Sequence, residues 1–323
     1  MSPTGNLRLY AGLVALAALA AGAAWYLAAP APIAAAPVTA DGATDRTLAD
    51  AAATAARHAD AVSTPTSLPP ADMPLKQSHA ALVAGMNRGD TAATSRLYLD
   101  LTRCARAKAV IRASARFADD VLSQRPDVET SSAQETQLDQ AERRMQNAER
   151  LKTLCEGVDE GMLRSLAAVT LRAAQLGDAG ARNCYVHRGP FMNPQEMVEH
   201  PESIGVYRAQ APALIENALQ QGDWRMVDML QYAYSPRSGS MLAGLVGHDD
   251  VQHYRYLKLF LLGADPRAIK RLEKEMADAA GALTPDQIAQ ADGWAKTTFE
   301  RDFRGVSNEA APQRWDACAV PED

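Results

Sequence analysis

A glycine–aspartate pair recurs along this chain between stretches whose apolar residues have helical spacing. Glycine just past a helix end adopts the left-handed conformation at little cost. Aspartate at the next position accepts hydrogen bonds from the free N–H groups of a following helix. The pair therefore predicts the end of one helix and the start of another. It stands at Gly89-Asp90, Gly177-Asp178 and Gly222-Asp223, and in a longer form at Gly263-Ala264-Asp265.

The residues that flank these turns favour pairs of amphipathic helices. One helical face before Gly222 carries Leu214, Ile215, Ala218 and Leu219, and after it come Val227, Leu230 and Tyr234. The four turn glycines are 88, 45 and 41 residues apart, and 88 is two periods of 44. A further helix start is predicted at Thr284, which is followed by Pro285 and, three residues on, by Gln287. We predict an all-α fold, an array of antiparallel helical hairpins similar to an α-α superhelix, over residues 75–323.

A long central helical hairpin is predicted between Cys104 and Cys155. Two amphipathic segments flank the stretch RPDVETSS at residues 125–132, where Pro126 breaks the helical pattern. The predicted apolar stripes are Val110, Ala113, Phe117 and Val121 on the first arm and Leu138, Ala141, Met145, Ala148 and Leu151 on the second. The polar face of this hairpin is either a docking surface or, more simply, a solvated face.

The four cysteines predict two disulfide bonds, because an even number in an exported chain favours pairing and C-x-x-C is absent. The midpoint of residues 104–155 falls at about residue 130, inside the predicted turn, so equal arms return Cys104 and Cys155 to one level. Two free buried thiols are the alternative for this pair. Cys184 and Cys318 remain as the second bond, which would hold the C-terminal tail across the helices.

The amino-terminal region predicts a membrane anchor. Residues 9–29 form an uncharged run of 21 residues, about the ~20 that cross a bilayer as a helix. Arg8 precedes the run, so residues 1–8 are expected in the cytoplasm. Residues 30–74, rich in proline and alanine, predict a disordered linker. We expect a single-pass protein of the bacterial inner membrane with residues 75–323 in the periplasm; secretion to the periplasm after signal cleavage is the alternative.

Motifs for catalysis, cofactor binding and metal binding are not recognised in this sequence: H-E-x-x-H, G-x-S-x-G and the P-loop are absent. No catalytic residue, cofactor or metal is therefore predicted. His248 and His253, with His187 or His200, are conceivable zinc ligands, but ordinary half-exposed histidines beside capping carboxylates are the simpler interpretation. A net charge of −6 without a basic stripe argues against a nucleic-acid partner.

Residues 184–205, CYVHRGPFMNPQEMVEHPESIG, are the least repeat-like stretch of the predicted body. Long irregular loops on helical scaffolds often carry function, so we interpret this stretch as a candidate contact loop. A plain connector is the alternative. The candidate contact residues are His187, Arg188, Phe191, Met192 and His200.

The phrases MNRGDTAATSRLYLDL, AAQLGDAGARNCY and LTPDQIAQADGWAKTTFERDF resemble the Sel-one-like branch of tetratricopeptide-type repeat proteins. In that family A-x-x-G-D-x-x-A joins adjacent helices, and a T-P-x-Q-I-A-x-A helix often closes the array. The resemblance covers about half of the body and favours a degenerate array. It implies protein–protein binding or scaffolding.

These features together predict a non-enzymatic scaffold in the cell envelope. Its helical body would bind a protein or a peptide, and residues 9–29 would hold it in the inner membrane. Two other functions stay open. One is an exported hydrolase that acts on the envelope from a helical scaffold, and the other is a purely structural spacer.

Overall fold

The computed structural model describes residues 68–123, 131–264, 269–305 and 316–319. Within these ranges the fold has thirteen α-helices and no strand, which confirms the prediction that it is all-α. The first helices are α3 (Leu75–Asn87), α4 (Thr91–Ser123), α5 (Ser131–Leu154), α6 (Glu160–Arg164), α7 (Leu166–Gln175), α8 (Ala179–Arg188) and α9 (Pro194–Glu199). They are followed by α10 (Glu202–Gln220), α11 (Trp224–Ala233), α12 (Met241–Val246), α13 (Asp250–Leu262), α14 (Ile269–Ala280) and α15 (Pro285–Thr298). The 3-10 helix η1 (Gly189–Met192) follows α8, and the π-helical turn η2 (Phe299–Phe303) follows α15.

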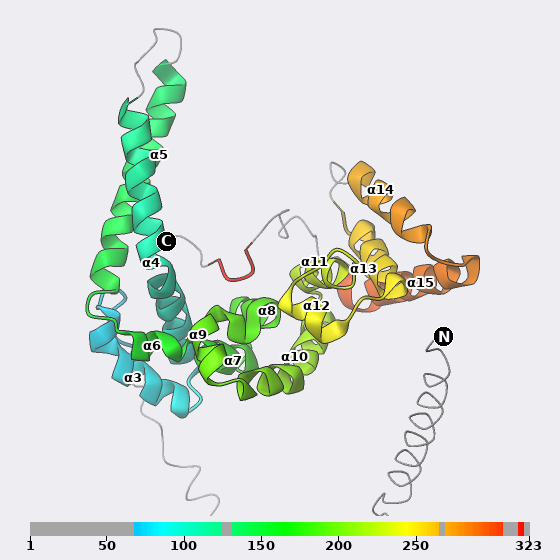
Figure 1. Cartoon of the computed structure of the whole chain (residues 1–323), viewed down its shortest axis with the longest axis horizontal. Coiled ribbons are helices and arrows are strands. Elements are labelled where there is room, and N and C mark those ends of the chain that lie inside the picture. The colour runs from blue at the N-terminus through cyan, green and yellow to red at the C-terminus, as the bar shows by residue number, and fades with distance from the viewer. Residues whose placement is uncertain (1–67, 124–130, 265–268, 306–315, 320–323) are drawn as a thin grey trace, which may run out of the picture. The chain divides into compact units, whose positions relative to one another are not determined.

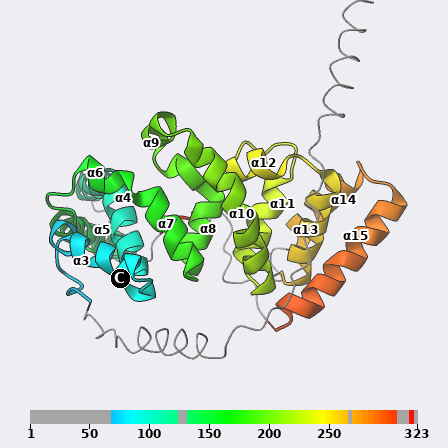
Figure 2. The same ribbon diagram turned by 90° about the horizontal axis from the view of Figure 1, so that it is seen from below.

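Each helix packs mainly against helices that are near it in the chain (Figures 1 and 2). The contacts run from α3 to α4, then to α7, α8, α10 and α11, and continue through α13 to α14 and α15. A single cluster of buried residues follows this path from Leu75 in α3 to Phe303 in η2, with Cys318 packed into it. Helices α4 and α5 lie against each other and extend beyond the other helices in Figure 1.

The three Gly-Asp turns share one hydrogen-bond pattern. The glycines Gly89, Gly177 and Gly222 have φ angles of 82°, 97° and 70°. In each turn the aspartate N–H donates to the carbonyl five residues earlier at 3.0 Å, and the glycine N–H donates to the carbonyl three residues earlier. This pair of bonds is the Schellman motif that closes a helix. The aspartate carboxylate then accepts a backbone N–H of the next helix at 2.9–3.0 Å, so these three predicted helix ends and starts are confirmed.

The fourth predicted turn, after α13, is different. Gly263 has a φ of −103°, so the prediction of a left-handed glycine here is wrong. Packing requires glycine instead, because a Cβ at this position would lie 2.4 Å from Cζ2 of Trp224. The Trp224 ring packs against Phe303, with ring centroids 4.4 Å apart, and this contact holds it in place. Asp265, the predicted cap, lies outside the described residues.

Helix α15 begins with the predicted capping box. The Gln287 N–H donates to Thr284 Oγ1 at 3.3 Å, and the Thr284 N–H donates to Gln287 Oε1 at 2.9 Å. Two other helices begin with side-chain caps that the sequence analysis does not predict. Asp159 begins α6 and Ser240 begins α12, each by accepting a backbone N–H from the first turn.

Helices α4 and α5 pack through residues that coincide in part with the predicted stripes. Their buried positions include Ala107, Ser114 and Val121 on α4 and Ala141, Ala148 and Leu151 on α5. The predicted positions Ala113, Leu138 and Met145 are exposed instead. The burial of Val121, Ala141, Ala148 and Leu151 confirms part of the predicted stripes. Ala107 and Ser114 were not in the predicted stripe, but they recur with Val121 every seven positions, which is a heptad spacing.

Across the portion of the chain that the structure describes, no helix combines the length and the apolar character that a membrane span needs. The predicted anchor, residues 9–29, lies outside that portion, as does most of the predicted linker. The turn predicted at residues 125–132 also falls largely outside it.

Candidate functional site

The two predicted cysteine pairs lie at disulfide distance. Cys104 in α4 and Cys155, directly after α5, have an S–S distance of 2.07 Å and a Cα–Cα distance of 5.3 Å. Cys184 in α8 and Cys318 have an S–S distance of 2.07 Å and a Cα–Cα distance of 4.5 Å. One bond ties the interior of α4 to the end of α5, and the other ties residues 316–319 to α8.

Residues 316–319 are also held by ionic contacts. Arg106 of α4 places Nη1 3.0 Å from Asp316 Oδ2 and donates to the Cys318 carbonyl at 3.3 Å. Asp316 Oδ1 accepts the Cys318 N–H at 3.0 Å and lies 3.8 Å from Nη2 of Arg188. The segment therefore connects α4 and α8.

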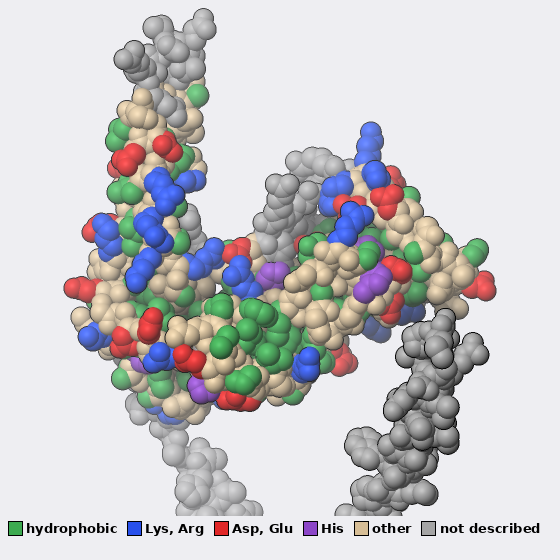
Figure 3. All heavy atoms as spheres, in the orientation of Figure 1, with side chains coloured by type: hydrophobic (Ala, Val, Ile, Leu, Met, Phe, Trp, Pro, Cys, Tyr) green, Lys and Arg blue, Asp and Glu red, His purple; other side chains and the backbone are tan. Residues whose placement is uncertain are grey.

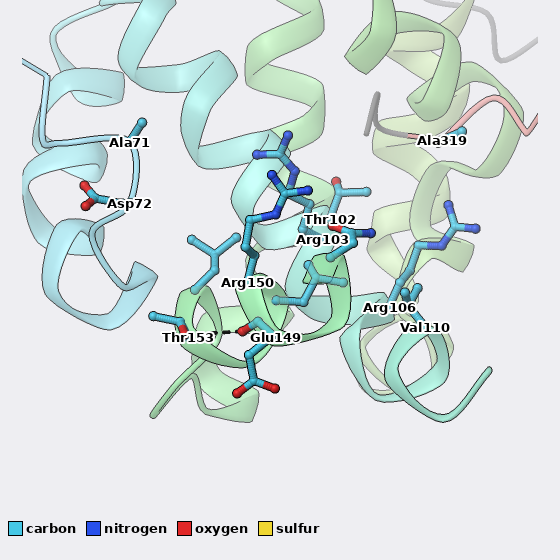
Figure 4. Close-up of a pocket in the computed structure, with 13 residues that line it drawn as sticks. Ala71, Asp72, Thr102, Arg103, Arg106, Val110, Glu149, Arg150, Thr153 and Ala319 are labelled. Atoms are coloured by element: carbon cyan, nitrogen blue, oxygen red, sulfur yellow. Dashed lines mark hydrogen bonds between the residues drawn. The ribbon is translucent and has the colours of Figure 1, made fainter. Parts of the chain in front are cut away.

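A cavity of about 500 Å³ lies between α4, α5, residues 71–72 and Ala319 (Figure 4). Its volume is within the ~300–1,000 Å³ of sites that enclose small ligands. The lining residues are Ala71, Asp72, Thr102, Arg103, Arg106, Val110, Asn147, Glu149, Arg150, Leu151, Thr153, Leu154 and Ala319.

Three residues that line the cavity are sequence neighbours of disulfide-bonded cysteines. Arg103 precedes Cys104, Leu154 precedes Cys155, and Ala319 follows Cys318. The covalent bonds therefore limit how far these walls can separate. A binding site whose walls are fixed before the ligand arrives loses less conformational entropy on binding.

The cavity combines arginine side chains with an apolar surface. The apolar part includes Val110, Leu151 and Leu154. Arg103, Arg106 and Arg150 contribute guanidinium groups, and in Figure 4 the side chains of Arg103 and Arg150 run toward the same part of the cavity. A guanidinium presents a planar set of N–H donors that matches a carboxylate or a phosphate. The lining is therefore suited to an anionic group attached to an apolar body.

Two acidic residues also belong to the lining of the cavity. Asp72 and Glu149 line the cavity together with the three arginines. Glu149 Oε2 lies 2.7 Å from Lys152 Nζ, and Figure 4 shows this carboxylate pointing away from the arginines. Lys152 therefore pairs with this carboxylate on the side that faces away from the guanidinium groups.

A buried carboxylate beneath the cavity anchors Arg103. Asp100 is fully buried, with Oδ2 2.6 Å from Arg96 Nε and Oδ1 3.7 Å from Arg103 Nη1. The side chain of Arg103 is only 21% exposed, so its charge is poorly screened by water.

The predicted contact loop is helical, so its description as an irregular loop is wrong. His187 and Arg188 form the last turn of α8, Phe191 and Met192 lie in η1, and His200 directly follows α9. Gly189, with a φ of 48°, directly follows α8 and is the first residue of η1.

Long-range packing explains the short elements of this segment. A Cβ at Gly189 would lie 2.5 Å from Cδ2 of Tyr207, so the ring sits directly on the glycine. The Tyr207 hydroxyl donates to the Val186 carbonyl at 2.7 Å, which joins α10 to the end of α8.

The segment presents an apolar surface away from the cavity. Phe191, Val198 and Val206 are 48%, 75% and 46% exposed, and Figure 3 shows hydrophobic side chains gathered near α9 and α10. None of the five predicted contact residues lines the cavity, and Arg188 lies 3.8 Å from Asp316 in the segment that contributes Ala319 to the lining. Their role in binding a partner stays a prediction.

Three of the histidines considered as conceivable zinc ligands contact other groups. His248 Nδ1 donates to the Tyr234 carbonyl at 2.9 Å, and His253 Nδ1 donates to the Gln231 carbonyl at 2.6 Å. His200 Nδ1 lies 3.1 Å from Oε1 of Glu202. Among the residues with described positions, no three His, Cys, Asp or Glu side chains come together as metal ligands would.

The chemistry of the cavity is the basis for assigning a ligand. Comparison of the chain with protein-family models, with curated proteins and with solved structures finds no match.

Proposed function

We propose that this chain is a membrane-anchored periplasmic protein whose helical body binds a peptide segment of another envelope protein. The cavity between α4 and α5 is the binding site, and residues 9–29 hold the protein in the inner membrane. The single observation that carries the proposal is a cavity of about 500 Å³ with three walls adjacent to disulfide bonds.

The lining of the cavity favours a peptide over a wholly apolar or a wholly ionic ligand. Leu151 and Leu154 offer an apolar wall for a side chain, and Arg103 and Arg150 offer donors for carbonyl or carboxylate oxygens. The volume suits a short segment and not a folded domain.

The turns of the body support a degenerate repeat array of the tetratricopeptide type. Gly89-Asp90, Gly177-Asp178 and Gly222-Asp223 have the same Schellman bonds and the same aspartate cap. Arrays of this kind present one helical unit after another and are commonly used to bind proteins. The paired helices α4 and α5 would be the inserted central hairpin of such an array.

Crosslinking in intact cells tests the proposal. A photocrosslinking amino acid replaces Val110 in the cavity or, as the control, Leu262, a 41% exposed residue on α13. We expect a discrete protein adduct from position 110 that is absent from position 262. The adduct should disappear when Thr153→Trp occupies the cavity. No adduct from position 110, or an adduct that Thr153→Trp leaves unchanged, would contradict the proposal.

A reporter fusion tests the topology. A reporter that is active only after export, fused after Asp323, is expected to be active in cells. Activity confined to a cytoplasmic reporter at the same position would contradict a periplasmic body.

A further inference from the structure

We infer that this chain forms a two-fold symmetric homodimer through the outer part of α4. Arg112 of each copy lies beside Asp119 of the other, and Ala115 lies at the symmetry axis. The partner is therefore a second copy of the same chain. None of these three residues lines the cavity, so the dimer surface is separate from the proposed peptide site.

The exposed charges of α4 and α5 are separated along the length of the two helices. The acidic residues of the outer part are Asp119, Asp120, Glu135, Asp139 and Glu142, and the basic residues nearer the other helices are Lys108, Arg112, Arg116, Arg143 and Arg144. Figure 3 shows a group of basic side chains on this pair of helices, with acidic side chains farther out. Two copies that point in opposite directions bring unlike charges together, and two that point the same way bring like charges together.

One exposed stripe of α4 has this charge polarity. Lys108, Arg112, Ala115, Asp119 and Leu122 are spaced four, three, four and three residues apart, so they lie on one side of the helix. The buried positions 107, 114 and 121 are at least about 100° away around the helix axis. Leu122 is 73% exposed, which leaves a large apolar side chain on this outer side.

The stripe is complementary to itself when a second copy runs in the opposite direction. Residues whose numbers add to about 230 then lie opposite each other. Arg112 meets Asp119 twice, once on each side of the axis, and Ala115 meets its own copy. Leu122 lies opposite Lys108, whose aliphatic stem can cover it.

The two charges that would pair between copies are not paired within one copy. Among the residues that the structure describes, neither Arg112 nor Asp119 takes part in an ion pair. Arg112 Nε donates to the Lys108 carbonyl at 3.1 Å, a main-chain contact that does not neutralise the guanidinium. Because one exposed ion pair contributes little to stability, the two pairs mainly set the direction of pairing, and burial of Leu122 stabilises it.

The pairing involves only the part of α4 that projects beyond the other helices. Ser123, the last residue of α4, lies opposite position 107 of the second copy. Arg106, which precedes that position, already contacts Asp316. The paired stretch, residues 107–123, is about 24 Å long at ~1.5 Å per residue. An axis at Ala115 places the remaining helices of the two copies at opposite ends of this stretch, so they do not compete for the same space.

Disulfide crosslinking of the full chain, purified in detergent micelles, tests the inference. Ala115→Cys brings two thiols together at the axis, and copper–phenanthroline is the oxidant. We expect a covalent dimer on a non-reducing gel. Ala113→Cys is the matched control, because Ala113 is exposed but lies about 160° around the helix from Ala115. Its dimer yield should be at least tenfold lower.

Charge reversal separates this pairing from general association. In the Ala115→Cys background, Arg112→Asp and Asp119→Arg are each expected to lower the dimer yield at least fivefold, because like charges then lie opposite each other in both pairs. The two substitutions together recreate both pairs with exchanged signs and should return the yield to within twofold of Ala115→Cys alone. That recovery also shows that the substituted chain folds.

Three results would overturn the inference. Equal dimer yields from Ala113→Cys and Ala115→Cys would show that copies associate without using this stripe. Single charge reversals that leave the yield unchanged, or a combination that stays as low as the single reversals, would show that Arg112 and Asp119 do not meet. No covalent dimer from Ala115→Cys would mean that something other than a second copy covers the stripe.

Discussion

Arg182 Nη2 lies 2.9 Å from Oδ2 of Asp223, with only 3% and 13% of the two side chains exposed. The other carboxylate oxygen, Asp223 Oδ1, accepts the Arg225 N–H at 3.0 Å and so begins α11. Asn183 Nδ2 donates to the same aspartate at 3.0 Å. The Gly-Asp turn before α11 therefore caps a helix and also anchors it to α8 through a buried ion pair.

Two aspartates in equivalent turns should therefore differ in their contribution to stability. Asp178→Ala removes a cap and is expected to lower the free energy of unfolding by about 1 kcal/mol. Asp223→Ala also leaves Arg182 buried without its carboxylate, and is expected to cost about 3–5 kcal/mol. Urea unfolding measures both. Asp223→Asn, which keeps a capping oxygen but loses the charge, should fall between them, and equal losses at positions 178 and 223 would contradict this account.

Glycine at position 263 is expected to be required by packing. Gly263→Ala places a Cβ 2.4 Å from the Trp224 ring and should lower the free energy of unfolding by about 1–3 kcal/mol. Gly293→Ala is the control, because a Cβ there meets nothing within 4 Å and the residue lies inside α15. That substitution should raise stability by up to about 1 kcal/mol. The same sign for both substitutions would count against the packing explanation.

The Cys184–Cys318 bond should affect the cavity more than the helices. Removing it in the double variant Cys184→Ser, Cys318→Ser releases the segment that carries Ala319, one wall of the cavity. We expect weaker peptide binding with nearly unchanged helix content by circular dichroism. Removing the Cys104–Cys155 bond, which closes a separation of 51 residues, should cost about 4 kcal/mol in the chain-entropy treatment. Peptide affinity that survives loss of the Cys184–Cys318 bond would show that the tail is not a wall of the site.

Stability should fall at mildly acidic pH because of His187. Burial, with a smaller effect from Arg188 and an opposing one from Asp316, lowers the pKa of His187 below its ordinary 6.5. Between these two pKa values the unfolded chain binds more protons than the folded one, so the free energy of unfolding decreases as the pH falls below 6.5. His187→Gln should lose less stability than the parent over this interval. Identical pH profiles for parent and His187→Gln would disprove the assignment.

Local signals predicted the helix boundaries well. The starts at Asp90, Asp178, Asp223 and Thr284 depend on hydrogen bonds within a few residues, which a short stretch of sequence contains. The reason for glycine at position 263 could not be predicted in this way. It is the packing against Trp224, which lies 39 residues earlier in the chain.

The prediction of an irregular loop after α8 was wrong because the structure there also depends on a contact with a more distant residue. Proline and glycine at residues 189–194 have the composition of a loop. Tyr207 packs on Gly189 and bonds to Val186, and this contact allows short helical elements to follow one another.

The cavity itself could not be found from the sequence. Its walls come from residues 71–72, 102–110, 147–154 and 319, which are far apart in the chain and carry no common motif. The two predicted cysteine pairs were the available signal, since each lies next to a lining residue, but they indicate only which segments are joined.

Hydrogen exchange of the full chain, alone and with the peptide segment identified from the adduct at position 110, tests most directly whether the cavity is the binding site. We predict slower exchange for backbone N–H groups in residues 102–110 and 147–155, and no change in residues 189–206, where the exposed apolar surface lies. Protection confined to residues 189–206, with the two segments of the cavity unchanged, would contradict the central claim and would assign binding to the surface of η1, α9 and α10.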